Sequence, residues 1–100
     1  MKEIIFHPLP LAQQELNDAI GYYKTQDKAI ALEFLDTVES STKLLTRYPE
    51  LGLKFRGSVR RLVISKFPYS LVYRLLDGEQ IYILAIAHHK QKPNYWRKRK

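Results

Sequence analysis

The sequence contains no cysteine and no apolar run that approaches the length of a membrane span. The lack of thiols excludes disulfides and thiolate metal sites, which suits a reducing compartment. A membrane helix needs about 20 consecutive apolar residues, and residues 1–16 lack the apolar core and cleavage site of a secretory signal. We therefore expect a soluble, cytoplasmic protein with no membrane contact.

Acidic residues are scarce in the second half of the chain. Residues 51–100 hold twelve basic residues against two acidic ones, a net charge of +10, whereas residues 1–50 hold five against eight, a net charge of −3. Charge placed in this way favours a polyanion or an acidic protein as partner. A cationic surface that serves solubility alone is the other interpretation.

Several catalytic motifs are also missing. There is no Gly-rich phosphate loop, no Gly-x-Ser-x-Gly sequence and no thiol nucleophile, and we expect no cofactor. His88 and His89 are adjacent, so in an extended chain their rings point to opposite faces and cannot bind one metal ion together. His7 is the only other histidine, and we expect no metal site.

The first half of the chain has the pattern of one strand and two helices. Residues 3–6 predict a strand that stops at His7-Pro8. Apolar residues then recur at helical spacing over 9–26, and again from Asp27, a good N-cap, to Tyr48-Pro49. A break of about three residues between the helices implies an antiparallel hairpin.

The second half has the period of a sheet. Runs of β-branched and aromatic residues at 59–64, 70–75 and 80–87 predict three antiparallel strands, with a tight turn at Asp77-Gly78. Residues 50–58 have loop chemistry, and a last turn of helix is expected after Pro93.

These elements predict one α+β domain over residues 1–100. Its order is β-α-α-β-β-β, with the helical hairpin packed on one face of a mainly antiparallel four-stranded sheet. The other face of the sheet is expected to be partly open.

The open sheet face is where the sequence places its functional groups. Arg61 lies opposite the face of Leu62 and Ile64, and the last strand ends in two histidines and two lysines. Such cations neutralise phosphates. The candidate residues for binding a partner or nucleic acid are Arg60, Arg61, Arg74, His88, His89, Lys90 and Lys92.

Metal-independent RNA cleavage is one reaction that these groups suit. It needs an acid and a base near the 2′-hydroxyl and cations that stabilise developing charge. His89 and Lys92 are the candidates for acid and base. The alternative is that each histidine is an ordinary surface residue.

The C-terminal residues have two interpretations. Tyr95 and Trp96 either anchor the end of the chain on the sheet, which we favour, or stack on bases. Residues 97–100, all basic, are expected to form a mobile tail.

Motifs along nearly the whole chain resemble the RelE/ParE superfamily of bacterial toxins. They are the stretch RRLVISKFPYSLVYRL (60–75), the late His-x-x-x-x-Pro and Tyr-Trp signals, and three helical features. The helical features are Ala12-x-x-Glu15-Leu16, Tyr22-Tyr23 and Tyr48-Pro49-x-x-Gly52.

The resemblance implies a toxin of a type II toxin–antitoxin system. Such a toxin is held inactive in a hetero-oligomer by a cognate antitoxin, often acidic, whose flexible C-terminal segment wraps it. RelE-like members cut messenger RNA on the ribosome with basic residues and often a late tyrosine. ParE-like members inhibit DNA gyrase and are not nucleases.

Two departures favour the ParE and plasmid-stabilisation branch. Ser70 stands where RelE-like enzymes have an arginine, and Lys90 or Lys92 replaces a late arginine; a hydroxyl cannot replace a bidentate, permanently charged donor. Gyrase inhibition is therefore the leading hypothesis, and a non-toxic basic binding domain is a third. The second is a ribosome-dependent messenger ribonuclease, with candidate catalytic residues His89, Lys92, Arg60, Arg61 and Tyr95.

Overall fold

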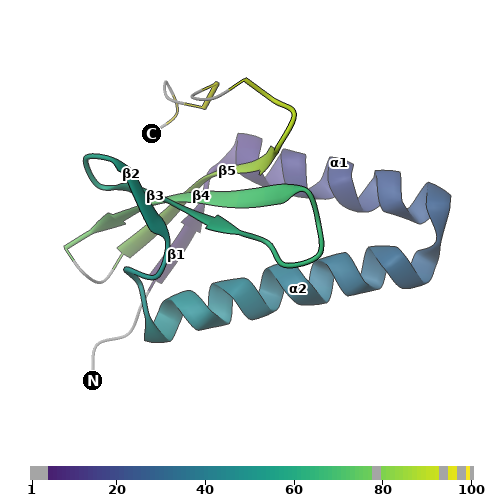
Figure 1. Cartoon of the computed structure of the whole chain (residues 1–100), viewed down its shortest axis with the longest axis horizontal. Helices are drawn as coiled ribbons and strands as arrows, with labels where there is room; N and C mark the ends of the chain where they lie inside the picture. The colour runs from purple at the N-terminus through teal and green to yellow at the C-terminus, as the bar shows by residue number, and fades with distance from the viewer. Residues whose placement is uncertain (1–4, 78–79, 93–94, 97–98, 100) are drawn as a thin grey trace.

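A computed structural model describes residues 5–77, 80–92, 95–96 and 99 of the chain. Two helices form a long hairpin beside a five-stranded sheet (Figure 1). In chain order the elements are β1 (Ile5–Pro8), α1 (Pro10–Gln26), α2 (Lys28–Arg47), β2 (Leu53–Arg56), β3 (Val59–Val63), β4 (Tyr69–Leu76) and β5 (Gln80–His88).

Asp27 alone joins the two helices. Its N–H donates to the carbonyl of Tyr23 at the end of α1, and its carboxylate accepts from the N–H of Ala29 at 2.8 Å, which caps the start of α2. The predicted break of about three residues is therefore one residue. α1 begins with Pro10 in its first turn, where the missing N–H costs no hydrogen bond. In the described part of the chain, neither helix is both long and apolar enough to cross a membrane.

The sheet has the strand order β1-β5-β4-β3-β2. β1 runs parallel to β5, and the other pairs are antiparallel. The predicted α+β class is confirmed, but the predicted count of four strands was wrong. β2 lies inside the segment expected to be a loop, and it turns into β3 through Gly57-Ser58, where Gly57 has φ +57°.

β2 escaped prediction because it is a short edge strand without a buried side. All four of its residues are exposed, and Leu53 is 74% exposed. Its sequence therefore alternates apolar with basic residues without the burial pattern of an inner strand. The dipeptide Gly57-Ser58 was the available signal for a hairpin.

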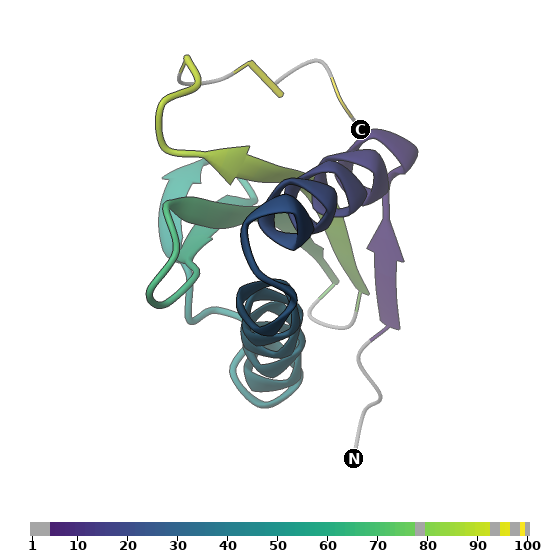
Figure 2. The ribbon, with the colours of Figure 1, turned by 90° about the vertical axis from the view of Figure 1, so that its right-hand side faces the viewer.

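The main core lies between the helical hairpin and one face of the sheet. Figure 2 shows the hairpin in front of the sheet, with β1 on one flank and β3 on the other. The buried residues there come from both helices, from β4 and β5, and from Ile64 just after β3: Ala12, Ala19, Phe34, Val38, Leu45, Ile64, Leu71, Tyr73, Ile81, Ile83 and Ile86. The other face, here called the open face, has a smaller cluster of Val59, Val72, Leu84, Ala85 and Trp96.

Candidate functional site

The open face is built from alternate residues of β3, β4 and β5. Residues of β4 alternate between the two faces of the sheet, because Val72 belongs to the open-face cluster whereas Leu71 and Tyr73 lie in the main core. On β3, Val59 lies on the open face, and Arg61 two residues later shares it. The two strands therefore present Arg61 and Ser70 on one surface.

A β-bulge in β5 decides which histidine joins this surface. Val72 pairs with Ala85 and Tyr73 pairs with Ile83, so Leu84 is the extra residue. Leu84 and Ala85 consequently both contribute to the open-face cluster. Beyond the bulge the alternation is reversed, and position 89 reaches the open face instead of position 88.

The two histidine rings point to opposite sides of the sheet, as predicted. His88 packs edge-on against Tyr69 of the helix side, with ring centroids 4.9 Å apart. The Nε2 atom of His89 is hydrogen-bonded to Oγ of Ser70 at 3.0 Å. Ser70 is only 1% exposed, and it is the one buried polar side chain in the described part of the chain.

Ser70 and His89 lie in a small cavity at one end of the open face, here called the basic pocket. Its volume is about 110 Å³. The cationic side chains that line it belong to β3 and to the segment after β5. The lining residues are Phe55, Arg61, Ser70, Val72, Ala87, His88, His89, Gln91, Lys92, Tyr95 and Trp96.

The basic pocket gathers only some of the predicted binding residues. Arg61, His89, Lys92 and Tyr95 line it, and His88 borders it although its ring packs against Tyr69 on the helix side. Arg60 points to the other side of β3, where it donates to the carbonyls of Gly52 and Glu50 and lies 3.6 Å from the Glu50 carboxylate.

Arg74 and Lys90 lie apart from the basic pocket. Arg74 is half-buried farther along β4. Lys90 is exposed in the turn after β5, where its N–H donates to Nδ1 of His88 at 3.0 Å.

Glu15 of α1 holds the wall of the pocket in place, and sequence reasoning did not find this role. Its carboxylate accepts from the Tyr95 hydroxyl at 2.5 Å, from Arg99 at 2.8 Å and from the N–H of Ile86 at 3.1 Å. Burial, and then the hydrogen bond to Glu15, raise the pKa of Tyr95 well above its ordinary value. The Tyr95 proton is therefore held by Glu15.

Arg99 completes this arrangement, here called the Glu15 latch. It also donates to the carbonyl of Leu84 at 3.1 Å and lies over the Tyr95 ring. The latch thus binds backbone groups of β5 at and near the bulge residue Leu84. Arg97, Lys98 and Lys100 lie outside the described residues, so the mobile tail stays a prediction for them, but Arg99 is an ordered contact.

The other C-terminal predictions have separate outcomes. Trp96 is buried on the open face against Phe55, with ring centroids 5.6 Å apart, and serves as the anchor that we favoured. The expected turn of helix begins at Pro93 and Asn94, which lie outside the described residues.

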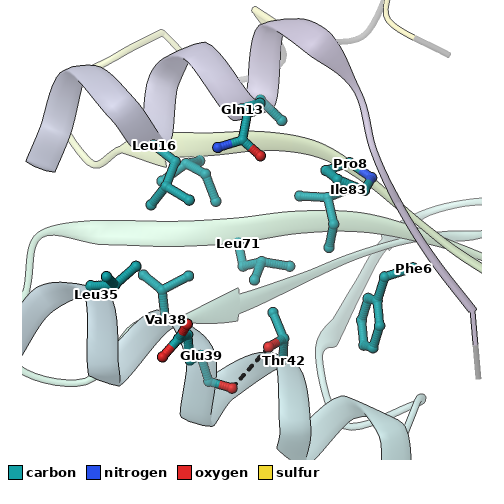
Figure 3. Close-up of a pocket in the computed structure, with 12 residues that line it drawn as sticks. Phe6, Pro8, Gln13, Leu16, Leu35, Val38, Glu39, Thr42, Leu71 and Ile83 are labelled. Carbon is teal, nitrogen blue, oxygen red and sulfur yellow. Dashed lines mark hydrogen bonds between the residues drawn. The ribbon is translucent and has the colours of Figure 1, made fainter.

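A second cavity opens between the two helices and is here called the groove. Figure 3 shows Leu16 of α1 and Val38 of α2 on opposite sides of it, with Leu71 of the sheet between them. Its volume is about 290 Å³, close to the lower limit of typical ligand sites. Its lining is mostly apolar, with polar side chains at Gln13, Glu39 and Thr42.

A family model described as ParE toxin of type II toxin-antitoxin system, parDE, matches residues 6–93. The chain belongs to the ParE toxin family. A solved structure titled as the chromosomal ParDE TA system from P. aeruginosa is similar, with a TM-score of 0.71 and 21% identity. The match covers 85% of this chain and 95% of that chain, and at this identity it shows the fold. No curated protein gives a significant sequence match.

The ParE family match ends just before the residues that close the basic pocket. Tyr95, Trp96 and Arg99 follow residue 93, whereas Glu15, which binds two of them, lies well inside the matched region. In this ParE family member, the pocket thus combines a family core with a C-terminal wall beyond the matched range. The Glu15–Arg99 contact spans 84 residues, so no local pattern could have revealed it.

Proposed function

We propose that the protein is a growth-arresting toxin that acts on DNA gyrase in the cytoplasm and is neutralised by a cognate antitoxin. Ser70 is the observation that carries the choice of target. The arginine that the resemblance to RelE-like nucleases would place here is a serine, which is buried and hydrogen-bonded to His89. This position therefore supplies no permanent positive charge to a scissile phosphate.

The second candidate is a ribosome-dependent messenger ribonuclease. It is favoured by the convergence of Arg61, His89 and Lys92 on one pocket. Two of its other candidate residues are engaged elsewhere, because Arg60 binds loop carbonyls and the Tyr95 hydroxyl binds Glu15. The nuclease candidate therefore depends on three residues.

The antitoxin has two complementary surfaces available. The groove suits apolar side chains of an amphipathic segment, and the cationic half of the chain suits acidic ones. Contacts between cationic and acidic side chains weaken as salt screens their charges, whereas contacts between apolar side chains do not. The salt dependence of the complex therefore reports which surface dominates.

Inducible expression in bacteria, with and without the neighbouring gene, tests the leading proposal. We expect growth arrest, gyrase-linked DNA breaks and continued translation, and rescue by the neighbouring gene. Rapid loss of translation with cuts inside ribosome-bound messages would favour the ribonuclease. No growth arrest would leave a non-toxic basic binding domain.

Two substitutions test the ribonuclease directly. If it operates, His89→Ala and Lys92→Ala abolish message cutting. Neither residue lines the groove, so antitoxin binding stays intact if the groove is the dominant surface. Normal cutting by both variants would show that these residues have no catalytic role.

A further inference from the structure

Charge in this protein is separated by layer as well as by sequence. The helical hairpin, residues 10–47, holds six acidic and four basic residues, whereas residues 53–92 hold eight basic and two acidic ones. None of the acidic residues lies in the described strands β2 to β5. A polyanion is therefore drawn to the sheet side of the molecule.

The basic pocket has the chemistry of an oxyanion site. Arg61 and Lys92 carry hydrogen-bond donors with positive charge, and no acidic side chain is among the described lining residues of the pocket. Ser70 and His89 share one hydrogen bond, so the pair has fewer donors left for a ligand than the two side chains would have separately. A volume of about 110 Å³ leaves room for a small anionic group such as a phosphate.

The donors of the pocket belong to three segments of the chain. Arg61 comes from β3, Ser70 from β4, and His89 and Lys92 from the segment after β5. The oxygens of a carboxylate lie in one plane, whereas the two anionic and two ester oxygens of a phosphodiester are arranged tetrahedrally. Side chains from three segments suit the tetrahedral group.

Arg74 offers a second positive charge along the same face. It pairs with Tyr82 and Val59, both of the open-face side, and its buried Nε has no hydrogen-bond partner among the described residues. Ser70 and Arg74 are four residues apart on one strand, about 13 Å. Phosphates of one DNA strand advance about 3.4 Å each along the axis, so the face spans several of them.

We propose that the open face binds the phosphodiester backbone of nucleic acid, with one phosphate in the basic pocket and Arg74 beside its neighbours. This binding goes beyond the proposed action on gyrase, because it requires neither gyrase nor the antitoxin. Duplex DNA and single-stranded RNA both supply the phosphodiester.

Fluorescence anisotropy with the purified full-length protein tests this proposal. The probes are a labelled duplex DNA of about 20 base pairs and a single-stranded RNA of equal length, each titrated at several salt concentrations. We expect binding that weakens with salt, and the tighter probe identifies the natural source. No salt-dependent binding to either probe would overturn the proposal.

Matched variants assign the binding to the open face. Arg61→Gln should lower affinity about tenfold and reduce the salt slope by about one, because Arg61 is exposed and makes no ion pair with another described residue. Lys24 is an exposed cation of the helical layer, and Lys24→Gln should change neither the affinity nor the salt slope. Equal losses in both variants would show unspecific attraction to net charge.

A polyglutamate peptide of similar charge separates nucleic acid from an acidic protein. We expect it to compete at least tenfold more weakly than the duplex. Equal competition that is lost in Arg61→Gln would overturn the nucleic-acid proposal in favour of an acidic peptide. Thermal unfolding of each variant confirms that the exposed substitutions leave the fold intact.

Discussion

Among the described glycines, Gly52 has the least room for a side chain. A Cβ atom there would lie 2.7 Å from the hydroxyl oxygen and 2.8 Å from Cε1 of Tyr73. The Tyr73 ring is fully buried, and its hydroxyl accepts from the Gly52 N–H at 2.9 Å and donates to the Pro49 carbonyl at 2.8 Å. These contacts give the Tyr48-Pro49-x-x-Gly52 motif a structural reason.

Replacing Gly52 should therefore destabilise the fold. Gly52→Ala is expected to lower the free energy of unfolding by about 1–3 kcal/mol, because a buried ring must move. Urea denaturation measures the change. Gly21→Ala is the control, since Gly21 lies in α1 with no atom within 4 Å of the added Cβ, and it should stabilise by about 0.5–1 kcal/mol. Equal stability of Gly52→Ala and the parent would refute the close contact.

Ionisation of the Tyr95 hydroxyl should make the stability of the fold depend on pH in the alkaline range. Burial and the Glu15 carboxylate raise its pKa in the folded chain. Above pH ~10 the unfolded chain loses this proton first, so the stability from Tyr95 is complete below that pH and is lost as the pH rises. Burial raises the pKa of Tyr23, Tyr69 and Tyr73 as well.

The alkaline fall in melting temperature should thus be smaller in Tyr95→Phe than in the parent, though still present. Thermal unfolding followed by circular dichroism between pH 8 and 11 measures this difference. Identical pH profiles for the two proteins would show that Tyr95 ionises equally in the folded and unfolded chains.

The bulge in β5 and the Glu15 latch work together at the scale of elements. β5 continues past its last pairing with β1, that of Pro8 with Ile83, and there Arg99 donates to the Leu84 carbonyl and Glu15 accepts from the Ile86 N–H. α1, β5 and the C-terminal segment are thereby joined through one carboxylate. The pair is largely shielded from water, with side chains 15% and 20% exposed.

Replacing Arg99 should lower the free energy of unfolding more than replacing an exposed cation. Arg99→Gln is expected to lower the free energy of unfolding by about 1–3 kcal/mol, because the half-buried Glu15 charge loses its partner. Lys66→Gln is the matched control, since its ion pair with Glu33 is exposed, and it should cost less than about 1 kcal/mol. If chemical denaturation gives a similar, small loss of unfolding free energy for both variants, the Glu15 latch does not stabilise the fold.

The whole molecule presents two unlike surfaces on opposite sides of one sheet. The apolar groove lies between the helices, and the cationic pocket lies on the open face. The sheet between them is covered on the helix side by the main core. Binding at the two surfaces should therefore be separable by substitution.

Thr42→Arg tests this separation. Thr42 lines the groove and is half-buried, and its hydroxyl bonds only within its own helix. A charge there should weaken antitoxin binding at least tenfold, because an unpaired cation in an apolar groove is costly. Growth arrest should persist but escape rescue by the antitoxin. Normal co-elution of the variant with the antitoxin would place the antitoxin elsewhere.

Local patterns predicted most elements of the fold. Both helices, β3, β4 and β5 were found within one or two residues of their ends, because apolar period and capping residues such as Asp27 act over short distances. β2 was missed because an exposed edge strand has no buried face to mark it. Of the candidate site residues, Arg61, His89 and Lys92 line one pocket, whereas Arg60 lies on the other side of β3.

The sequence by itself determined the α+β class, the alternation of β4, the separation of charge and the family, because each is written in local period or motif. Only the tertiary structure decided which histidine meets Ser70, since the bulge at Leu84 reverses the faces of β5. It also decided that Glu15 binds Arg99, 84 residues away. A contact of that separation depends on how all the intervening elements pack, and no local pattern encodes it.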